Sequence, residues 1–457
     1  MARLVIVSNR VPTLGRRAQA GGLAVALQSV ASPGTLWFGW SGQTATKTAT
    51  EPRIGEARGV SYATLDLSAS DYGQFYVGFS NATLWPLFHF RTGLMRFSRD
   101  DYAGYLSVNR SFAEALMPLL RPDDLVWVHD YHLIPLGEEL RRLGYKGRLG
   151  FFLHIPFVPP AVLQVLPPAA ELVRMLCAYD LTGFHTSRFV QDFLASARDL
   201  AGAEVTENSV RLDGRETAVG AFPIGIDAAA FARTAVRALE TGYIARVRES
   251  LQGRALIVSA DRLDYSKGLP NRLEGFGRLL ARFPQHHRKV SFLQIAARSR
   301  EDVAEYQSLR RELDRMTGDL NGRFSHFDWV PLRYMTQMVQ RPRLAGLFRM
   351  ARIGLVTPLQ DGMNLVAKEF VAAQDSEDPG VLVLSRFAGA AEQLRDALIV
   401  NPYDPDEIAD AMHAALEMPL EERKRRHDSL REAVFQGTAA QFCASYLDAF
   451  EAVPLAA

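Results

Sequence analysis

The sequence has few of the features that mark secreted, membrane or nucleic-acid-binding proteins. It contains two cysteines in 457 residues, Cys177 and Cys443, which lie far apart and match no metal-binding spacing. The first apolar run, residues 4–7, stops at Asn9 and Arg10, too early for a signal peptide, and no later run has membrane-spanning length. Lys and Arg number 52 against 51 Asp and Glu, so the net charge of +1 favours neither nucleic acid nor an anionic membrane as a partner. We therefore expect a cytoplasmic protein with reduced, structural thiols.

Repeats, low-complexity blocks and the GxGxxG fingerprint of dinucleotide-binding domains are also absent from the sequence. The missing fingerprint disfavours a dehydrogenase, which is a common enzyme class with two nucleotide-binding domains. Apolar residues make up 48% of the chain and charged residues 23%, as in an ordinary globular enzyme.

Strand-like and helix-like segments alternate along the whole chain, which predicts an α/β fold with parallel sheets. At 457 residues the chain is too long for a single core. The pattern breaks at Pro223 and Gly225, so we predict one domain over residues 1–225 and a second over 226–437, with a final helix within 438–457 packing back on the first. The clearest predicted strands cover residues 4–7, 125–129 and 150–153 in the first domain and 255–260, 290–296, 353–356 and 381–384 in the second.

Residues 353–369 predict a strand, a tight turn and a helix. Asn364 is placed to cap the helix, whose first amides and dipole favour a phosphate. A carboxylate accepts two hydrogen bonds side by side, so Asp361 and Glu369 are candidates to bind neighbouring sugar hydroxyls. These features indicate a sugar-nucleotide site, although an ordinary βα junction with solvated acids has the same local pattern. The residues of this candidate site are Asp361, Gly362, Met363, Asn364, Leu365 and Glu369.

Basic residues follow predicted strands at several places. Arg262 and Lys267 lie in a predicted loop, where Arg binds phosphate through a planar fork and Lys as a mobile point charge. Together they are candidates to neutralise a diphosphate leaving group as its charge develops. Asp264, between them, either orients one of them or is a solvated turn residue. The other strand-end cations, which either bind phosphate or face water, are Arg10, Arg298 and Arg300.

Polar clusters follow three strands of the first domain, at residues 8–10, 130–132 and 154–156. Because ligands gather at the carboxyl ends of parallel strands, these clusters predict one cleft. Asp130 is a candidate to orient an acceptor hydroxyl or take its proton, and His154 to hydrogen-bond a sugar hydroxyl. Gly22, in a Gly-Gly pair that opens a helix, is a candidate to offer its backbone amide to a ligand, although a Gly-Gly turn is common without one.

Three aromatic residues, Trp40, Tyr76 and Trp85, lie in segments broken by Gly and Pro. They either pack in the core or line a pocket, where a phenol or indole N–H bonds a phosphate or hydroxyl.

The sequence predicts no metal site. His129 ends a predicted strand and His132 follows it, but no further ligand stands at a metal-binding spacing. The acid-x-acid string Asp404-Pro-Asp406 is of a kind that binds Mg²⁺ in some enzymes. It follows the last predicted strand in a predicted surface turn, so we discount it.

Ten short motifs are spread along the chain. They are VSNR at 7–10, AGGLA at 20–24, WFGW at 37–40, FSN at 79–81, LWP at 84–86, VHDYH at 128–132, FLHIPF at 152–157, RLDYSKG at 262–268, DGMNLV at 361–366 and LSRFAG at 384–389. In these motifs the chain resembles the trehalose-6-phosphate synthase family nearly from end to end. The resemblance implies a GT-B fold, in which two Rossmann-like domains face each other across a cleft. It also implies transfer of glucose from a nucleotide-glucose to glucose 6-phosphate, with retention of configuration and no assigned enzymic nucleophile, in which the leaving diphosphate takes the proton of the attacking hydroxyl.

The resemblance also implies roles for single residues. It assigns the diphosphate to Arg262, Lys267 and the Gly22 amide, the ribose to Glu369 and the donor glucose to Asp361 and His154. It assigns the phosphate of glucose 6-phosphate to Arg10, Tyr76 and Arg300, and the acceptor sugar to Asp130, Trp40 and Trp85. It assigns catalysis to Arg262, Lys267, His154 and Asp130, without a metal or another cofactor. The resemblance also implies a homo-oligomer.

Two segments depart from the family pattern, FVPPA at 157–161 and AARSR at 296–300. They bear on acceptor details and loop closure, so two alternatives stay open. One is a related enzyme with another acceptor, such as a glucosylglycerol-phosphate synthase, and the other is a catalytically silent sugar-phosphate sensor. The sequence does not choose among UDP, GDP and ADP as the donor nucleotide, nor does it give the oligomeric state.

Overall fold

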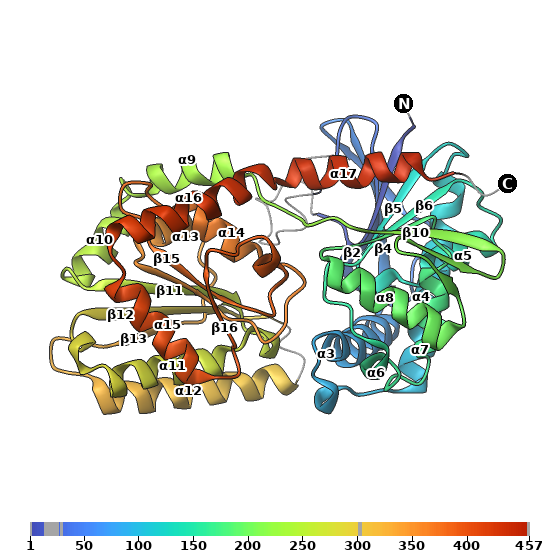
Figure 1. The fold of residues 1–457 in the computed structure, drawn as a ribbon. Helices are drawn as coiled ribbons and strands as arrows, with labels where there is room; N and C mark the ends of the chain where they lie inside the picture. Colours follow the sequence, from blue (N-terminus) through green and yellow to red (C-terminus); the bar gives the residue numbers. More distant parts are fainter. Residues whose placement is uncertain (1, 13–26, 28–30, 300–303, 455–457) are drawn as a thin grey trace. The chain divides into compact units, whose positions relative to one another are not determined.

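The structure, a computed structural model, describes residues 2–12, 27, 31–299 and 304–454 of the chain. It divides into two compact units, Met1–Ile224 with Ala440–Ala457 (unit 1), and Gly225–Ala439 (unit 2). Each unit is an α/β body built around its own sheet (Figure 1). None of the described helices is both long and apolar enough to cross a membrane.

Unit 1 contains a ten-stranded sheet in the order β3-β4-β2-β1-β5-β6-β7-β10-β9-β8. The strands from β4 to β10 in this order run parallel, and β3, β9 and β8 pair antiparallel at the two edges. The strands are β1 (Leu4–Arg10), β2 (Leu36–Ala45), β3 (Arg53–Ala57), β4 (Val60–Ser68), β5 (Leu125–His129), β6 (Arg148–Phe152), β7 (Leu181–Phe184), β8 (Glu204–Val205), β9 (Ser209–Leu212) and β10 (Arg215–Ala221). The helices are α2 (Ala69–Asp71), η1 (Tyr72–Leu84), α3 (Trp85–Phe88), η2 (Thr92–Leu94), α4 (Arg99–Leu116), η3 (Met117–Leu119), η4 (Tyr131–Leu133), α5 (Leu136–Arg142), α6 (Pro160–Leu163), α7 (Ala169–Leu176), α8 (Ser187–Ala201) and α17 (Ala439–Ala452).

Unit 2 contains a six-stranded parallel sheet in the order β13-β12-β11-β14-β15-β16. Helices α9, α13, α14 and α16 lie on one face of this sheet and α11, α12 and α15 on the other (Figure 1). The strands are β11 (Ala255–Arg262), β12 (Val290–Ala297), β13 (Leu332–Met335), β14 (Ile353–Val356), β15 (Val381–Ser385) and β16 (Leu398–Val400). The helices are α9 (Ala228–Ala238), α10 (Gly242–Leu251), η5 (Tyr265–Lys267), α11 (Leu269–Arg282), η6 (Pro284–His286), α12 (Ala304–Phe324), α13 (Arg341–Met350), α14 (Leu365–Ala373), η7 (Gly389–Glu392), α15 (Pro405–Glu417) and α16 (Leu420–Gln436).

Both sheets are doubly wound, and each reverses its strand order at one place. In unit 1 the chain starts at β1, moves outward through β2, and later returns to the other side of β1 at β5. In unit 2 it starts at β11, moves outward through β12 and β13, and returns at β14. Ligands of such sheets bind beyond the carboxyl ends of the strands at this switch point. The topology therefore selects the ends of β1 and β5 in unit 1, and of β11 and β14 in unit 2.

Two strands run further than their apolar residues predict. The predicted strand 4–7 continues to Arg10, because Ser8 and Arg10 pair with Gly39 and Trp40 of β2. The predicted strand 255–260 continues to Arg262, which pairs with Ala297 of β12. Arg262 is thus the last residue of a strand, and the prediction that places it in a loop is wrong. Polar strand ends carry no hydrophobic pattern, so only pairing with the neighbouring strand reveals them.

Helix α17 belongs to unit 1, although it follows the last helix of unit 2 in sequence. The Tyr446 ring stacks on Trp127 of β5 at a centroid distance of 4.4 Å, and its hydroxyl donates to the carbonyl oxygens of Phe151 and Leu181 at 3.2 and 3.3 Å. A Cβ atom on Gly150 would lie 2.5 Å from the Tyr446 hydroxyl, so the glycine makes room for this ring. The last helix therefore covers the centre of the unit 1 sheet.

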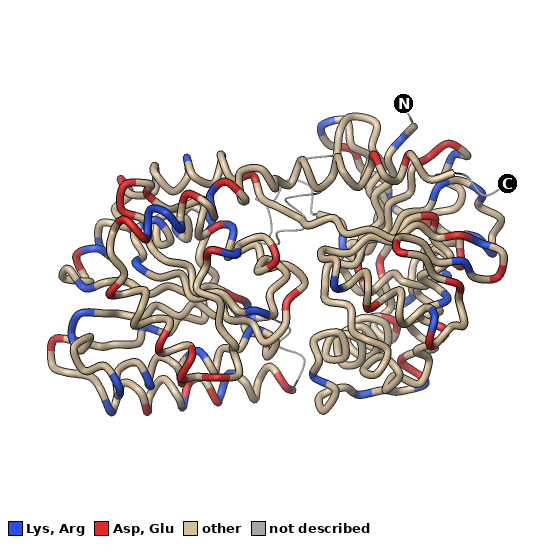
Figure 2. Tube along the Cα trace, in the orientation of Figure 1, with Lys and Arg blue, Asp and Glu red and all other residues tan. Residues whose placement is uncertain are grey.

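Acidic and basic residues alternate along the helices of both units (Figure 2). Helix α12, for example, carries ion pairs four residues apart between Arg310 and Asp314 and between Arg323 and Asp319. Intermixed charges of this kind agree with the net charge of +1.

Candidate active site

The loop after β14 leads into α14 through the predicted cap. Asn364 is the N-cap residue, and its side-chain oxygen accepts the Ala367 N–H at 3.3 Å. The same side chain donates from Nδ2 to Asp361 Oδ2 at 2.9 Å. Asn364 has a positive φ of 78°, which Asn tolerates better than most residues. The predicted cap is confirmed, and one side chain fixes both the helix start and the carboxylate of Asp361.

Lys267 and Asp361 form an ion pair at the switch point of unit 2. Lys267 Nζ lies 2.5 Å from Asp361 Oδ2, and both side chains are nearly buried, with 12% and 13% exposed. The pair joins the segment after β11 to the loop after β14. Gly268 lets these segments approach, because a Cβ on it would lie 2.4 Å from the Thr357 carbonyl oxygen and its φ is +65°. Two residues predicted from separate motifs are therefore in direct contact.

Asp264 is a buried residue that lies close to Arg262. Its side chain is fully buried and accepts the Ser266 N–H at 3.0 Å and the Tyr306 hydroxyl at 3.3 Å. The Arg262 guanidinium, half exposed, lies 3.9 Å from the same carboxylate. The sequence left two alternatives for Asp264, and the one that makes it a solvated turn residue is wrong. Asp264 caps η5, and its charge faces Arg262.

Arg272 of α11 connects the ends of the central strands of unit 2. Its side chain is completely buried and donates hydrogen bonds to Ser259 Oγ, Asp261 Oδ2 at 2.9 Å, Gln294 Oε1 at 3.2 Å, Thr357 Oγ1 at 3.0 Å and the Lys267 carbonyl oxygen at 3.0 Å. Burial lowers the pKa of this guanidinium and raises the pKa of the Asp261 carboxyl, which the Arg272 charge opposes. Sequence reasoning missed Arg272. Its position on the apolar face of α11, between Leu269 and Phe276, was the available signal, because a cation on such a face needs buried partners.

Glu369, predicted to bind ribose, is paired with Arg341. The two side chains approach to 3.1 Å, and Glu369 is 16% exposed. Burial raises the pKa of the Glu369 carboxyl, and Arg341 opposes that shift. Arg341 begins α13 and lies over the Phe231 ring at 5.1 Å. Sequence reasoning missed Arg341, since no local motif joins it to Glu369.

In unit 1, Asp130 follows β5 with a backbone conformation that favours glycine. Its φ is 77° and its ψ is 163°, a region that costs a non-glycine residue about 1–3 kcal/mol. The Asp130 N–H donates to the Phe152 carbonyl at 2.8 Å, and Asp130 Oδ1 accepts the His154 N–H at 3.3 Å. The predicted meeting of Asp130 and His154 is thus present. Strain of this kind concentrates at functional sites.

The imidazole of His154 is partly buried and lies against a second histidine. Its Nε2 lies 3.0 Å from Nδ1 of His129, and the His185 ring is 5.3 Å away. Burial lowers the pKa of His129 to about 3 and that of His154 well below its usual value. Both rings are therefore neutral near pH 7, and His154 can hydrogen-bond a ligand but does not supply a positive charge.

Arg10, at the end of β1, lies beside the predicted aromatic residues. Its guanidinium carbon is 5.8 Å from the centre of the Trp40 ring. Trp40 contacts Tyr76 at 5.9 Å, and Tyr76 stacks on His132 at 5.7 Å. A Cβ atom on Gly42, whose φ is +86°, would lie 2.5–2.7 Å from the Arg10 guanidinium. Gly42 was missed from the sequence, and it makes room for Arg10.

All three aromatic residues lie in regular elements, although Gly and Pro interrupt the sequence around them. Trp40 is in β2, Trp85 begins α3, and Tyr76 is in η1, a π-helix of 13 residues. A π-helix has no α-helical periodicity in its sequence, although it is frequent at functional sites. Trp40 is 7% exposed, and its indole N–H donates to the Gln43 carbonyl at 2.7 Å. That N–H is thus already bonded within the protein, while the Trp40 ring supports Arg10.

A protein-family model, glycosyltransferase family 20, matches residues 4–452. This chain belongs to glycosyltransferase family 20. It is 46% identical to the trehalose-6-phosphate synthase of Sinorhizobium fredii (strain NBRC 101917 / NGR234) over 98% of each chain. Its structure matches an α,α-trehalose-phosphate synthase (UDP-forming) from Burkholderia xenovorans in complex with glucose-6-phosphate, with a TM-score of 0.94, 45% identity and coverage of 98% and 100%. It also matches an E. coli trehalose-6-phosphate protein bound with UDP-2-fluoro glucose, with a TM-score of 0.94, 42% identity and coverage of 99% and 100%.

These matches establish the α/β GT-B fold and glycosyltransferase membership predicted from the sequence. Within this family member, two predicted ligand residues, Gly22 and Arg300, lie outside the described residues. Arg298 is exposed just after β12. Asp404, the first acid of the discounted acid-x-acid string, is the N-cap of α15 and accepts the N–H groups of Asp406 and Glu407.

Proposed function

We propose that this family 20 glycosyltransferase transfers glucose from UDP-glucose to glucose 6-phosphate, giving trehalose 6-phosphate and UDP. The observation that carries this proposal is the Lys267–Asp361 contact at the switch point of unit 2, which brings together a phosphate-binding cation and a sugar-binding acid. Relatives with 42% and 45% identity over nearly the whole chain are described as bound with UDP-2-fluoro glucose and with glucose-6-phosphate. These matches favour UDP among the three nucleotides that the sequence left open.

We assign the donor diphosphate to Arg262 and Lys267. As the glycosidic bond to the diphosphate breaks, negative charge grows on the leaving oxygens, and preorganised cations lower that barrier. Arg262 is held by buried Asp264, and Lys267 has three N–H donors, one of which already faces Asp361. Asp361 and Glu369 then bind sugar and ribose hydroxyls, with Gly22 and the amides at the start of α14 near the phosphates. We infer that configuration is retained and that no metal takes part.

We assign most of the acceptor contacts to unit 1. Arg10, supported by Trp40 and Gly42, binds the phosphate together with Tyr76 and Arg300. Asp130 orients the attacking hydroxyl, with Trp40 and Trp85 beside the sugar. His154 binds a hydroxyl of the donor glucose as a neutral hydrogen-bonding group, which agrees with its lowered pKa. The proton of the attacking hydroxyl passes to the departing diphosphate, which acquires basicity as the bond breaks.

The direct test uses purified protein, glucose 6-phosphate and, separately, UDP-, GDP- and ADP-glucose, all with EDTA present. Nucleotide release and product mass are followed, with an Arg262→Ala variant as the matched control. A phosphorylated non-reducing disaccharide formed from UDP-glucose is the expected result. Release only with another acceptor indicates the related enzyme, and sugar-phosphate binding without any turnover indicates the silent sensor.

We also propose that the protein is cytoplasmic and forms a homo-oligomer. Both cysteines are free and buried, and burial raises the pKa of each thiol to about 12, as suits inert structural thiols. The homo-oligomer rests on the family resemblance alone. Light scattering on the purified protein measures the oligomeric state, and a monomer at assay concentrations would contradict it.

A further inference from the structure

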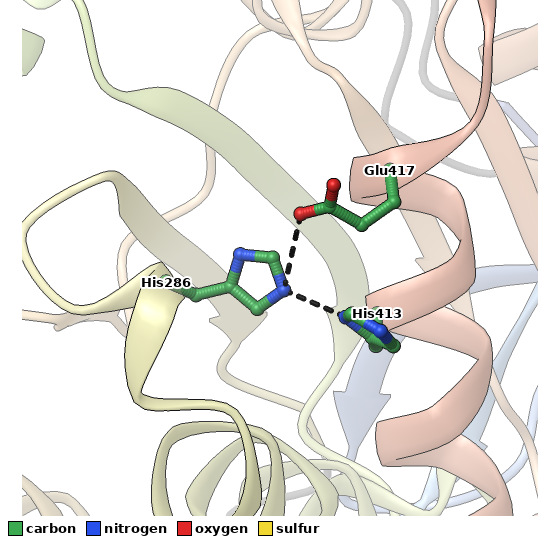
Figure 3. A group of neighbouring side chains, drawn as sticks. All are labelled: His286, His413 and Glu417. Atoms are coloured by element: carbon green, nitrogen blue, oxygen red, sulfur yellow. Dashed lines mark hydrogen bonds and ion pairs between the residues drawn. The ribbon is translucent and has the colours of Figure 1, made fainter.

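Three side chains of types that can bind a metal meet on unit 2, in a group that the proposed transfer reaction does not use. His413 and Glu417 lie four residues apart in α15, so both face the same side of the helix. His286, the last residue of η6, faces them (Figure 3). Its Nε2 lies 2.9 Å from His413 Nδ1 and 3.9 Å from Glu417 Oε1. One ligand atom from each residue lies within 4.8 Å of the other two.

The surrounding structure holds the two histidines in place. The His413 ring stacks on Phe283 at a centroid distance of 4.0 Å and an angle of 12°. The His286 side chain is 5% exposed, whereas Glu417 is 61% exposed and free to adjust its carboxylate. Helices α11 and α15 pack closely: a Cβ on Gly275 would lie 2.7 Å from Ile408 Cγ2. The group therefore stands on rigid elements, with one adaptable ligand.

Ion pairs also hold α15 against α11. Arg282, the last residue of α11, pairs with Asp406 at 3.0 Å and with Asp410 at 2.8 Å. These contacts fix α15 against the end of α11, just before the η6 turn that carries His286.

The donor set selects a class of ion. Two imidazole nitrogens and one carboxylate oxygen suit Zn²⁺ and its late first-row neighbours, whereas Mg²⁺ and Ca²⁺ take oxygen ligands. Tetrahedral ligands at about 2.0–2.1 Å from zinc lie about 3.3 Å from one another. The two distances from His286 Nε2, 2.9 and 3.9 Å, bracket that value. Lys289 adds a repulsive charge near His286, but it is exposed and screened by water.

We propose that His286, His413 and Glu417 bind one Zn²⁺ ion, with water as the fourth ligand. The ion joins η6 to the last turn of α15 and stabilises unit 2. It takes no part in glucose transfer, so this inference is independent of the proposed function.

The test measures zinc affinity and unfolding of the tag-free full chain after EDTA treatment and desalting. Titration calorimetry should show one Zn²⁺ per chain. At a zinc concentration 100-fold above Kd, Tm should rise by about 5–10 °C and return with EDTA, whereas Mg²⁺ should not change it. Zinc-edge X-ray absorption should show scattering from two imidazole rings.

Two variants and one control decide the assignment. His413→Gln and Glu417→Gln should each weaken zinc binding by about tenfold or more while leaving the metal-free Tm within a few degrees. His326→Gln changes an exposed histidine of the same unit outside the group and should bind zinc as the unchanged protein does. No stoichiometric zinc in the unchanged protein overturns the proposal, and so does equal binding by His413→Gln and His326→Gln.

Discussion

Replacing Arg272 should strongly destabilise unit 2, although this residue is not assigned to any ligand. Arg272→Met keeps much of the side-chain volume but removes all five N–H donors. It leaves Asp261 buried without its partner, which costs about 3–5 kcal/mol. The Lys267 carbonyl, which accepts from Arg272 at 3.0 Å, loses that bond at a further cost of about 1–3 kcal/mol if it stays buried. We therefore expect a loss of about 4 kcal/mol or more in the free energy of unfolding.

The loss should depend on pH. Burial raises the pKa of Asp261, and removing Arg272 raises it further because the opposing charge is gone. A carboxyl with a raised pKa in the folded state binds more protons folded than unfolded, so stability falls as pH rises from its unfolded pKa through its folded pKa. Arg272→Met should thus be less destabilising at pH 5 than at pH 7.5, relative to the unchanged protein.

Urea unfolding followed by circular dichroism at both pH values measures these effects. Arg278→Met, on the exposed face of the same helix, is the matched control and should lose less than about 1 kcal/mol, because its pairs with Glu274 and Asp406 are solvent-exposed. Arg272→Lys keeps a positive charge and should lie between the two, so it remains measurable if Arg272→Met does not fold. Equal unfolding midpoints for Arg272→Met and Arg278→Met would refute the reasoning.

Three further predictions concern the proposed reaction. Arg262→Ala should lower kcat by about 100-fold or more, whereas Arg10→Ala should mainly raise KM for glucose 6-phosphate; equal kcat losses in steady-state kinetics would contradict this division. Gly42→Ala should also raise KM for glucose 6-phosphate, because its Cβ displaces the Arg10 guanidinium, and an unchanged KM counts against that role for Arg10. Asp130→Gly and Asp130→Ala should both lose activity, but thermal unfolding should show Asp130→Gly more stable than Asp130→Ala by up to about 2 kcal/mol. Glycine relieves the strained φ, and this gain exceeds its entropic cost of about 0.5–1 kcal/mol; an alanine variant of equal or greater stability contradicts the strain.

Features with a local chemical signature could be predicted from the sequence. The apolar runs of β11 and β14, the polar residues at their ends and the Asn364 cap all depend on neighbouring residues, and the structure shows each of them. The α/β class followed from the alternation of such segments. Asp130 and His154 were placed together because parallel strands end at one edge of the sheet.

Features that depend on distant contacts could not be predicted in the same way. Arg341 reaches Glu369 from a different helix, and Gly42 matters only because the Arg10 guanidinium lies over it. The extension of β11 to Arg262 depends on pairing with β12, which no residue of β11 reveals. The π-helix that carries Tyr76 has no periodic pattern by which sequence reasoning recognises a helix. For Arg341, Gly42 and the end of β11, the deciding partner lies far away in sequence.

The charged residues assigned to the donor are largely paired within the protein itself. Lys267 is bonded to Asp361, Glu369 to Arg341, and Arg262 lies near Asp264. A diphosphate or sugar that binds there exchanges these contacts for new ones, so the net gain per contact is smaller than for an unpaired charge. The arrangement instead holds each group in a defined position before the substrate arrives. Preorganisation of this kind lowers the barrier most when charge develops on the leaving group, so these pairs should contribute more to kcat than to donor affinity.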